Sequence, residues 1–300
     1  MTSQPRNVLH FRVADIAFAV DFRDKDNVRG LIPAYKAFFV DGYDGEVDMM
    51  VRVESGLVDS EPEGEEIGQF DTGGTVHGVF RLPNGGYKFH LRNLGHEIVC
   101  AVRTDADFKN IKATLTEDKR FRGYGLNNCL MICFAYCAAY RRTVLMHASV
   151  VERNGKGYLF LGKSGTGKST HTQLWIRHLR GSRLLNDDNP AVRVDEDGKV
   201  TVFGTPWSGK TPCYHNESAP VGAFVQLEQW KENLIERETI INSFAAILTS
   251  CSTMMWDKPS YKQICDTVTA MITHVPVYHL RNLPNEDAVH LSHDTISQPV

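Results

Sequence analysis

Apolar and polar residues alternate through much of the first 115 positions of the chain. In residues 46–54 every second residue is apolar, so an extended segment would have one apolar and one polar face. Residues 75–93 alternate in the same way on both sides of an Asn-Gly-Gly turn at 84–86, which predicts a hairpin. The acidic residues 60–68 between them are expected to form a solvated, mobile loop. The pattern predicts a β-rich amino-terminal region over residues 1–118.

The pattern changes in the rest of the chain. Residues 123–140 are rich in apolar side chains and predict a buried helix. Beyond them, apolar segments of strand length alternate with segments of helical composition, which is typical of α/β domains. The predicted elements are strands over 143–151, 156–162, 182–188 and 221–229, a helix over 168–179, a hairpin over 191–206, helical residues 242–273 and a last strand over 275–280. They predict a second, α/β domain over residues 119–300.

Composition narrows the function classes. The net charge is −3 and no long basic run occurs, which argues against a nucleic-acid partner. No apolar run approaches the ~18 residues of a membrane span, so we expect a cytoplasmic protein without a membrane partner. The seven cysteines form no C-x-x-C pair. Cys129, Cys133 and Cys137 would share one helical face; a metal or cluster site is conceivable, but buried packing is favoured.

The segment GKSGTGKS at residues 162–169 carries the clearest chemistry. It fits G-x-x-x-x-G-K-[S/T] and lies between a predicted strand and a predicted helix. Glycines let successive backbone N–H groups point inward at a helix start, where they can bind phosphate. A glycine-rich turn with a chance Lys-Ser pair is the alternative. The candidate nucleotide-binding residues are Gly162, Lys163, Ser164, Gly165, Thr166, Gly167, Lys168, Ser169 and Thr170.

Two adjacent acids follow 18 residues after this loop, at the end of a predicted strand. Asp187 and Asp188, with Ser169, supply the hard oxygen atoms that Mg²⁺ prefers. One acid could hold the metal while the other accepts a proton from an attacking hydroxyl. The residues do not decide which acid has which role, and the pair could instead cap a turn before Pro190. His147, in a neighbouring predicted strand, either tunes one acid or is an ordinary core histidine.

These segments resemble a known family. The run MHASVV, GYLFLGKSGTGKST, RLLNDDNPAVRV and FGTPWSGK is similar to the catalytic domain of HPr kinase/phosphorylase, over about residues 123–292. That domain shares a P-loop, mixed-sheet fold with phosphoenolpyruvate carboxykinase. The resemblance implies phosphate contacts from the loop and Lys168, metal contacts from Ser169 and one acid, and a general base assisted by His147. It adds Lys210 as a phosphate contact and matches Arg281 without giving it a role.

The expected function is therefore an ATP- and Mg²⁺-dependent kinase. A hydroxyl of an unidentified protein or small-molecule acceptor would attack the γ-phosphate. The sequence does not decide whether the protein forms a homo-oligomer. One alternative is an ATP-binding switch or assembly factor with slow hydrolysis, although a simple switch needs only one metal-linked acid. Another is a small phosphoenolpyruvate carboxykinase-like enzyme, which an oxaloacetate assay would reveal.

Overall fold

The computed structural model describes residues 7–22, 28–71, 74–209 and 211–298. The chain divides into two compact units, Met1–Ala138 and Ala139–Val300. Each unit is a mixed α/β structure built on its own nine-stranded sheet. Among the described residues, no helix is both long enough and apolar enough to cross a membrane.

The first unit is β-rich, as its alternating sequence predicts. Its sheet has the order β3-β1-β2-β4-β9-β8-β7-β6-β5, and only the β2–β4 and β4–β9 pairs are parallel. The hairpin at residues 84–86 is confirmed, because β6 and β7 pair antiparallel across it. The strands are β1 (Asn7–Val13), β2 (Ile16–Phe22), β3 (Phe39–Val40), β4 (Met49–Ser55), β5 (Glu65–Asp71), β6 (Val76–Arg81), β7 (Tyr87–Arg92), β8 (Ile98–Thr104) and β9 (Asn110–Leu115).

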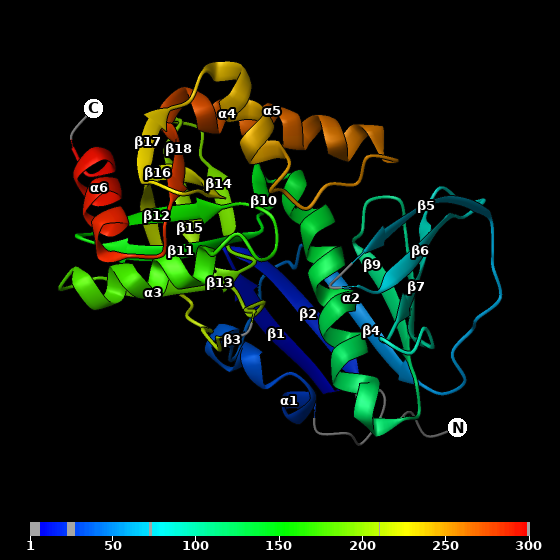
Figure 1. Ribbon diagram of the computed structural model, residues 1–300. Coiled ribbons are helices and arrows are strands. Elements are labelled where there is room, and N and C mark those ends of the chain that lie inside the picture. Colours follow the sequence, from blue (N-terminus) through cyan, green and yellow to red (C-terminus); the bar gives the residue numbers. More distant parts are fainter. Residues whose placement is uncertain (1–6, 23–27, 72–73, 210, 299–300) are drawn as a thin grey trace. The chain divides into compact units, whose positions relative to one another are not determined.

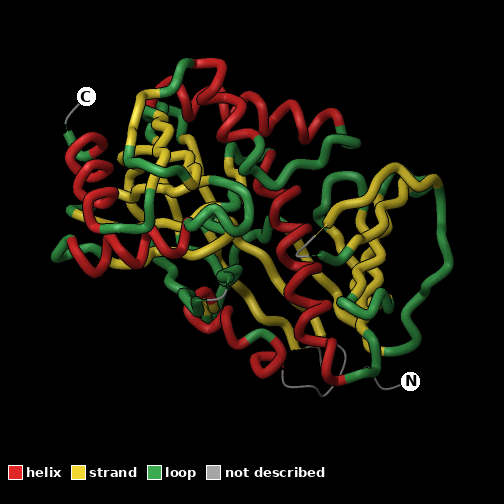
Figure 2. The backbone as a smooth tube through the Cα atoms, viewed as in Figure 1, coloured by secondary structure: helices red, strands yellow, loops and turns green. Residues whose placement is uncertain are grey.

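Three helical segments complete this unit: α1 (Val28–Leu31), the 3-10 helix η1 (Pro33–Phe38) and the long helix α2 (Lys119–Ala139). Figure 2 shows α2 crossing the strands of the first sheet. The Phe134 ring of α2 meets Phe18 at 6.4 Å between centroids, and Tyr136 stacks on Phe108 at 3.9 Å. These contacts explain why the structure groups α2 with the first unit, whereas the sequence placed the boundary before it, at 118/119.

The three cysteines of α2 lie within the first unit, where Cys137 Sγ is 3.8 Å from the Asp48 carbonyl oxygen. Cys129 and Cys133 are fully buried within the unit, as the packing interpretation expects. Among the described residues no cluster of three or more His, Cys, Asp or Glu side chains could hold a metal ion.

The acidic segment 60–68 differs from the expected mobile loop. Its second half belongs to β5, which pairs with β6. Its first half is tied to the sheet by two cations: Lys88 Nζ donates to the Glu61 carbonyl at 2.6 Å, and Arg103 pairs with Glu63. Lys88 also donates to Asp59 Oδ2 at 2.7 Å. Cations from neighbouring strands therefore offset the acidic charge that suggested solvation.

The second unit has the sheet order β10-β14-β15-β16-β12-β11-β13, and β18 joins β16 to β17. Strands β12, β16 and β18 run parallel to one another, and β11 is antiparallel to both β12 and β13. Its strands are β10 (Thr143–Leu145), β11 (Ala148–Arg153), β12 (Lys156–Leu161), β13 (Arg183–Asp188), β14 (Ala191–Val194), β15 (Val200–Phe203), β16 (Ser218–Gln229), β17 (Leu234–Arg237) and β18 (Val277–Asn282).

Helices cover both faces of this sheet (Figure 1). Helices α3 (Lys168–His178) and α6 (Glu286–Ile296) bury Trp175 and Val289 against one face, together with Phe160 and Leu280 of the strands. Helices α4 (Ile240–Leu248) and α5 (Lys258–His274) cover the other face. The predicted helical stretch 242–273 is thus two helices, because Asp257 caps a new helix start that contains a proline. The sequence did not predict β17 and α6.

The ends of several strands of the second sheet lie along one edge of that sheet. Because β11 is antiparallel to both neighbours, the ends of β12 and β13 meet its beginning, where Ala148 lies opposite both Leu161 and Asp188. The ends of β16 and β18 lie farther along this edge. Ligands of open α/β sheets bind beyond the carboxyl ends of parallel strands. The glycine loop, both acids and His147 all lie at this edge.

Candidate functional site

The glycine loop connects β12 to α3, and its conformation depends on glycine. Gly162, Gly165 and Gly167 have φ angles of 142°, 84° and 99°, which other residues rarely adopt. Gly167 is the N-cap of α3 and brings no side chain to cap the helix. The starts of α4, α5 and α6 are each capped by a side chain, from Thr239, Asp257 and Asn285 respectively. The first N–H groups of α3 therefore stay open to an external acceptor.

Lys168 lies under this loop and is only 8% exposed. Its Nζ donates to the carbonyl oxygens of Gly162 at 2.8 Å and Lys163 at 3.2 Å, and it lies 2.8 Å from His147 Nε2. All three partners are neutral when the histidine is neutral. Burial lowers the pKa of Lys168, and the charges of Asp188 and Asp187 act in the opposite direction without a direct ion pair among the residues described. A buried cation is thus held close to, but not against, its counter-charges.

The two acids have different partners. Asp187 is 5% exposed, and its Oδ1 accepts a hydrogen bond from Ser169 Oγ at 2.9 Å. Asp188 Oδ1 lies 3.3 Å from His147 Nδ1. Asp188 has a φ of 152°, a conformation costly for a residue with a side chain. The backbone turn at the strand end thus gives the neighbouring carboxylates separate surroundings.

The position of His147 corrects the predicted strand 143–151. The structure has two strands here, and β10 pairs with β14 whereas β11 pairs with β12 and β13. Between them, His147 N donates to the Ser250 carbonyl at 2.6 Å instead of to a sheet neighbour. A lysine ammonium can only donate, so Nε2 accepts from Lys168 and Nδ1–H faces Asp188. His147 therefore links the loop lysine to the second acid.

Residues 204–209 of the GTPWSGK segment hold the acid strand in place. Gly209 N donates to the Asp187 carbonyl, and Ser208 Oγ contacts the same carbonyl at 3.2 Å. A Cβ atom on Gly209 would lie 3.1 Å from both the Asp187 carbonyl oxygen and Asp188 Cβ, so the close approach favours glycine. Lys210, the predicted additional phosphate contact, lies outside the described residues.

The remaining predicted residues are placed around the loop. Lys163 accepts through its carbonyl from Thr166 Oγ1 at 2.9 Å, which closes the loop on itself. Ser164 is an exposed residue of the loop, and Thr170 lines a hollow beside the start of α3. Gln229 was not predicted; from the end of β16 its Nε2 donates to the Gly165 carbonyl at 3.0 Å. Arg281 pairs with Glu228 at 3.4 Å, and Glu228 belongs to neither the glycine loop nor the acid pair.

Comparison with known proteins adds little. No protein-family model matches the chain, and no curated protein matches it. Among solved structures, the structure of the Hpr(Ser) kinase/phosphatase from Coxiella burnetii aligns with a TM-score of 0.31 and 13% identity, covering 51% of this chain and 88% of that chain. A TM-score of 0.31 is too low to indicate a shared fold.

Proposed function

We propose that the protein is an ATP- and Mg²⁺-dependent phosphotransferase, with a hydroxyl of a protein or small molecule as acceptor. The observation that carries the proposal is the environment of Lys168. This buried ammonium contacts two carbonyls and a histidine, beside an open helix start and two carboxylates. Burying a cation without a paired anion is costly. A polyphosphate on the loop would supply that anion and the acceptors for the free N–H groups.

Ser169 and Asp187 fit the Mg²⁺ of such a nucleotide. Their oxygen atoms lie 2.9 Å apart, are hard ligands and sit directly at the loop. No larger metal cluster occurs among the residues described, which agrees with an ion that takes its remaining ligands from phosphate and water. When bound, Mg²⁺ would neutralise charge on the phosphates.

Asp188 is the better placed general base of the two acids, because its side chain is 36% exposed, whereas Asp187 is 5% exposed and accepts from Ser169. In the proposed step, the acceptor oxygen forms a bond to the γ-phosphorus and the bond between that phosphorus and the β–γ bridging oxygen breaks. The hydroxyl proton passes to Asp188, and ADP leaves. Hydrogen bonding from His147 Nδ1 orients this carboxylate. Lys168 stabilises the charge on the transferred group.

The test compares Asp187→Asn with Asp188→Asn, which keep side-chain size and remove one charge. Turnover is measured as phosphotransfer, or as ATP hydrolysis until an acceptor is known, beside calorimetric Mg·ATP binding. We expect both variants to lose at least ~10² in turnover. Asp188→Asn should keep Mg·ATP affinity, whereas Asp187→Asn should lose the Mg²⁺-dependent part. Near-normal turnover in both variants would show that the acids only form a turn, and would favour a nucleotide-binding switch.

A further inference from the structure

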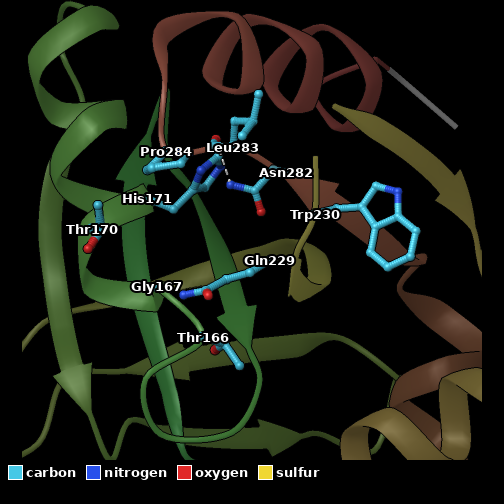
Figure 3. Close-up of a pocket in the computed structure, with 9 residues that line it drawn as sticks. All are labelled: Thr166, Gly167, Thr170, His171, Gln229, Trp230, Asn282, Leu283 and Pro284. Carbon is cyan, nitrogen blue, oxygen red and sulfur yellow. Dashed lines mark hydrogen bonds between the residues drawn. The ribbon is translucent and has the colours of Figure 1, made fainter. Parts of the chain in front are cut away.

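A hollow of about 390 Å³ lies beside the start of α3 (Figure 3). Along the sheet the order is β13-β11-β12-β16, with β18 beyond β16. The acids are the last two residues of β13, His147 directly precedes β11, and the loop follows β12. Gln229 and Asn282, which border the hollow, are register partners at the ends of β16 and β18. The hollow and the acid pair thus flank the loop from opposite sides.

This order gives a bound nucleotide a direction. In a loop of this type the lysine reaches the β- and γ-phosphates and the Ser hydroxyl reaches Mg²⁺. Lys168 and Ser169 are bonded to His147 and Asp187, so the γ-phosphate end belongs on the acid side. The opposite end of the triphosphate then leads past Thr170 into the hollow. Building on the function proposed above, we infer that this hollow is a nucleoside site that prefers adenine.

The walls of the hollow suit a flat, partly apolar ligand. Trp230 is 46% exposed and Leu283 is 37% exposed, so two large apolar side chains border the same hollow in contact with water. In Figure 3 the Gln229 and Asn282 side chains lie between the loop and the Trp230 indole. Aromatic side chains bind bases by stacking without reading their identity. Trp230 would therefore supply affinity for the base.

His171 supplies a second, independent feature. Its ring lines the hollow, is 1% exposed, and uses Nε2 for contacts with Trp175 and Ser292. Its Nδ1 is buried without a hydrogen-bond partner in the described structure, which is rare for a buried polar atom. The Trp175 indole can only donate, so His171 Nε2 accepts and Nδ1 carries the hydrogen, which a ribose hydroxyl could accept.

Asn282 gives the preference for adenine. The residue is 9% exposed, and its Nδ2 donates to the Leu283 carbonyl at 3.0 Å. This bond fixes the carboxamide and leaves Oδ1 as an acceptor. An asparagine carboxamide pairs with the amino group and N7 of adenine, whereas guanine presents a carbonyl oxygen in place of that amino group. Asn282 Oδ1 would then face a second acceptor, which disfavours GTP.

The experiment measures binding of Mg·ATP, Mg·GTP and Mg·tripolyphosphate to the full chain by calorimetry. Wild-type protein should bind ATP at least tenfold more tightly than either of the other two. Trp230→Ala should weaken ATP binding about tenfold and leave tripolyphosphate binding unchanged. Asn282→Ala should reduce the preference of ATP over GTP about tenfold. Tyr140→Ala is the matched control, because Tyr140 is 52% exposed and does not line the hollow.

The outcomes separate this inference from the function on which it depends. If tripolyphosphate binds as tightly as ATP and Trp230→Ala changes neither, the nucleoside site is wrong while the phosphate loop stands. If GTP binds as well as ATP, the assignment of Asn282 is wrong. If neither ATP nor tripolyphosphate binds, the proposed function itself fails. Thermal melting of each variant establishes that it is folded. If Asn282→Ala does not fold, Trp230→Ala still tests the nucleoside site, because Trp230 is exposed.

Discussion

Lys88 in the first unit and Lys168 in the second are both buried, yet their charges are balanced in different ways. The Lys88 side chain is 0% exposed, and its Nζ donates to the Asp59 carboxylate at 2.7 Å. That hydrogen bond is the main cause that lowers the pKa of Asp59 to about 2. Lys168 has no such ion pair among the described residues, and burial lowers its own pKa. One lysine is paired within the fold, whereas the other keeps its charge available.

The difference separates a structural charge from a functional one. A buried cation paired with a carboxylate holds a segment in place, here the acidic stretch before β5. A buried cation supported by carbonyls and a histidine contributes less to the fold than it costs. The proposed function accounts for its position through a ligand that brings negative charge. Substitutions at the two lysines should therefore have opposite consequences for stability and activity.

The largest effect is expected from Lys168→Met. Turnover should fall by about 10²–10³, because the substitution removes the charge that stabilises the transferred phosphoryl group. The free energy of unfolding should change little or increase, since a costly buried charge is replaced by an apolar side chain of similar length. ATP hydrolysis and denaturant unfolding measure the two quantities. Unchanged turnover would remove Lys168 from the site.

Substitutions in the Lys88 pair should do the reverse. Asp59→Ala leaves the ammonium buried without its carboxylate and should lower the free energy of unfolding by about 3 kcal/mol. Lys88→Met should cost about 1 kcal/mol, because the Asp59 side chain left behind is 45% exposed and can be hydrated. Denaturant unfolding measures both. Equal losses of unfolding free energy in the two variants would mean that desolvation of Lys88 does not dominate. A changed Mg·ATP affinity in either variant would give this pair a role in the candidate site.

A smaller effect is expected at His147. It acts through Asp188 and Lys168, so His147→Ala should lower turnover about tenfold with Mg·ATP affinity nearly unchanged. His279→Ala is the matched control, because that histidine pairs with Glu228 and Glu238 and is not a partner of the loop or the acids. Steady-state kinetics of the two variants should differ. Equal kinetics would make His147 an ordinary polar residue at the sheet edge.

The smallest effect is a pH dependence specific to the first unit. The pKa of Asp59 is lowered from 3.8 to about 2, so the folded state holds the charged form more strongly than the unfolded chain does. Its contribution to stability is complete above the higher value and is lost as the pH falls from 3.8 to about 2. Lys88→Met should lose less stability than wild type across this window. If the unfolding free energies of wild type and Lys88→Met changed in parallel with pH, the pairing of Asp59 with Lys88 would be contradicted.

Local pattern predicted much of the fold. Alternation placed β4 and the β6–β7 hairpin, and the order of strand, glycine loop and helix placed α3. The break at His147 could not be predicted, because it depends on a backbone bond to Ser250, far along the chain. The split between α4 and α5 had a local signal in Asp257 and Pro259 that the apolar pattern outweighed. The distant ion pairs of Lys88 likewise anchored an acidic segment that composition alone marks as solvated.

The sequence predicted the residues of the candidate site and their roles, except for the division of roles between Asp187 and Asp188. Spacing brought Ser169, Asp187 and Asp188 together as metal ligands, but only the fold separates Asp187, bonded to Ser169, from Asp188, facing His147. Gln229 and Asn282 lie 60 or more residues after the loop and carry no motif, so their position depends on strand order. Sheet topology, rather than sequence spacing, decides which side chains meet at an edge.

If Lys168 keeps its charge for a polyphosphate, as proposed, the charge should contribute to ligand-dependent thermal stability. Melting is recorded with and without Mg·ATP for wild type, Lys168→Met and Lys88→Met. At a hundred times the dissociation constant, ATP should stabilise wild type by about 2.7 kcal/mol. Lys88→Met should melt earlier and keep the full ATP-dependent shift, whereas Lys168→Met should lose most of it. An equal shift in wild type and Lys168→Met would contradict the account.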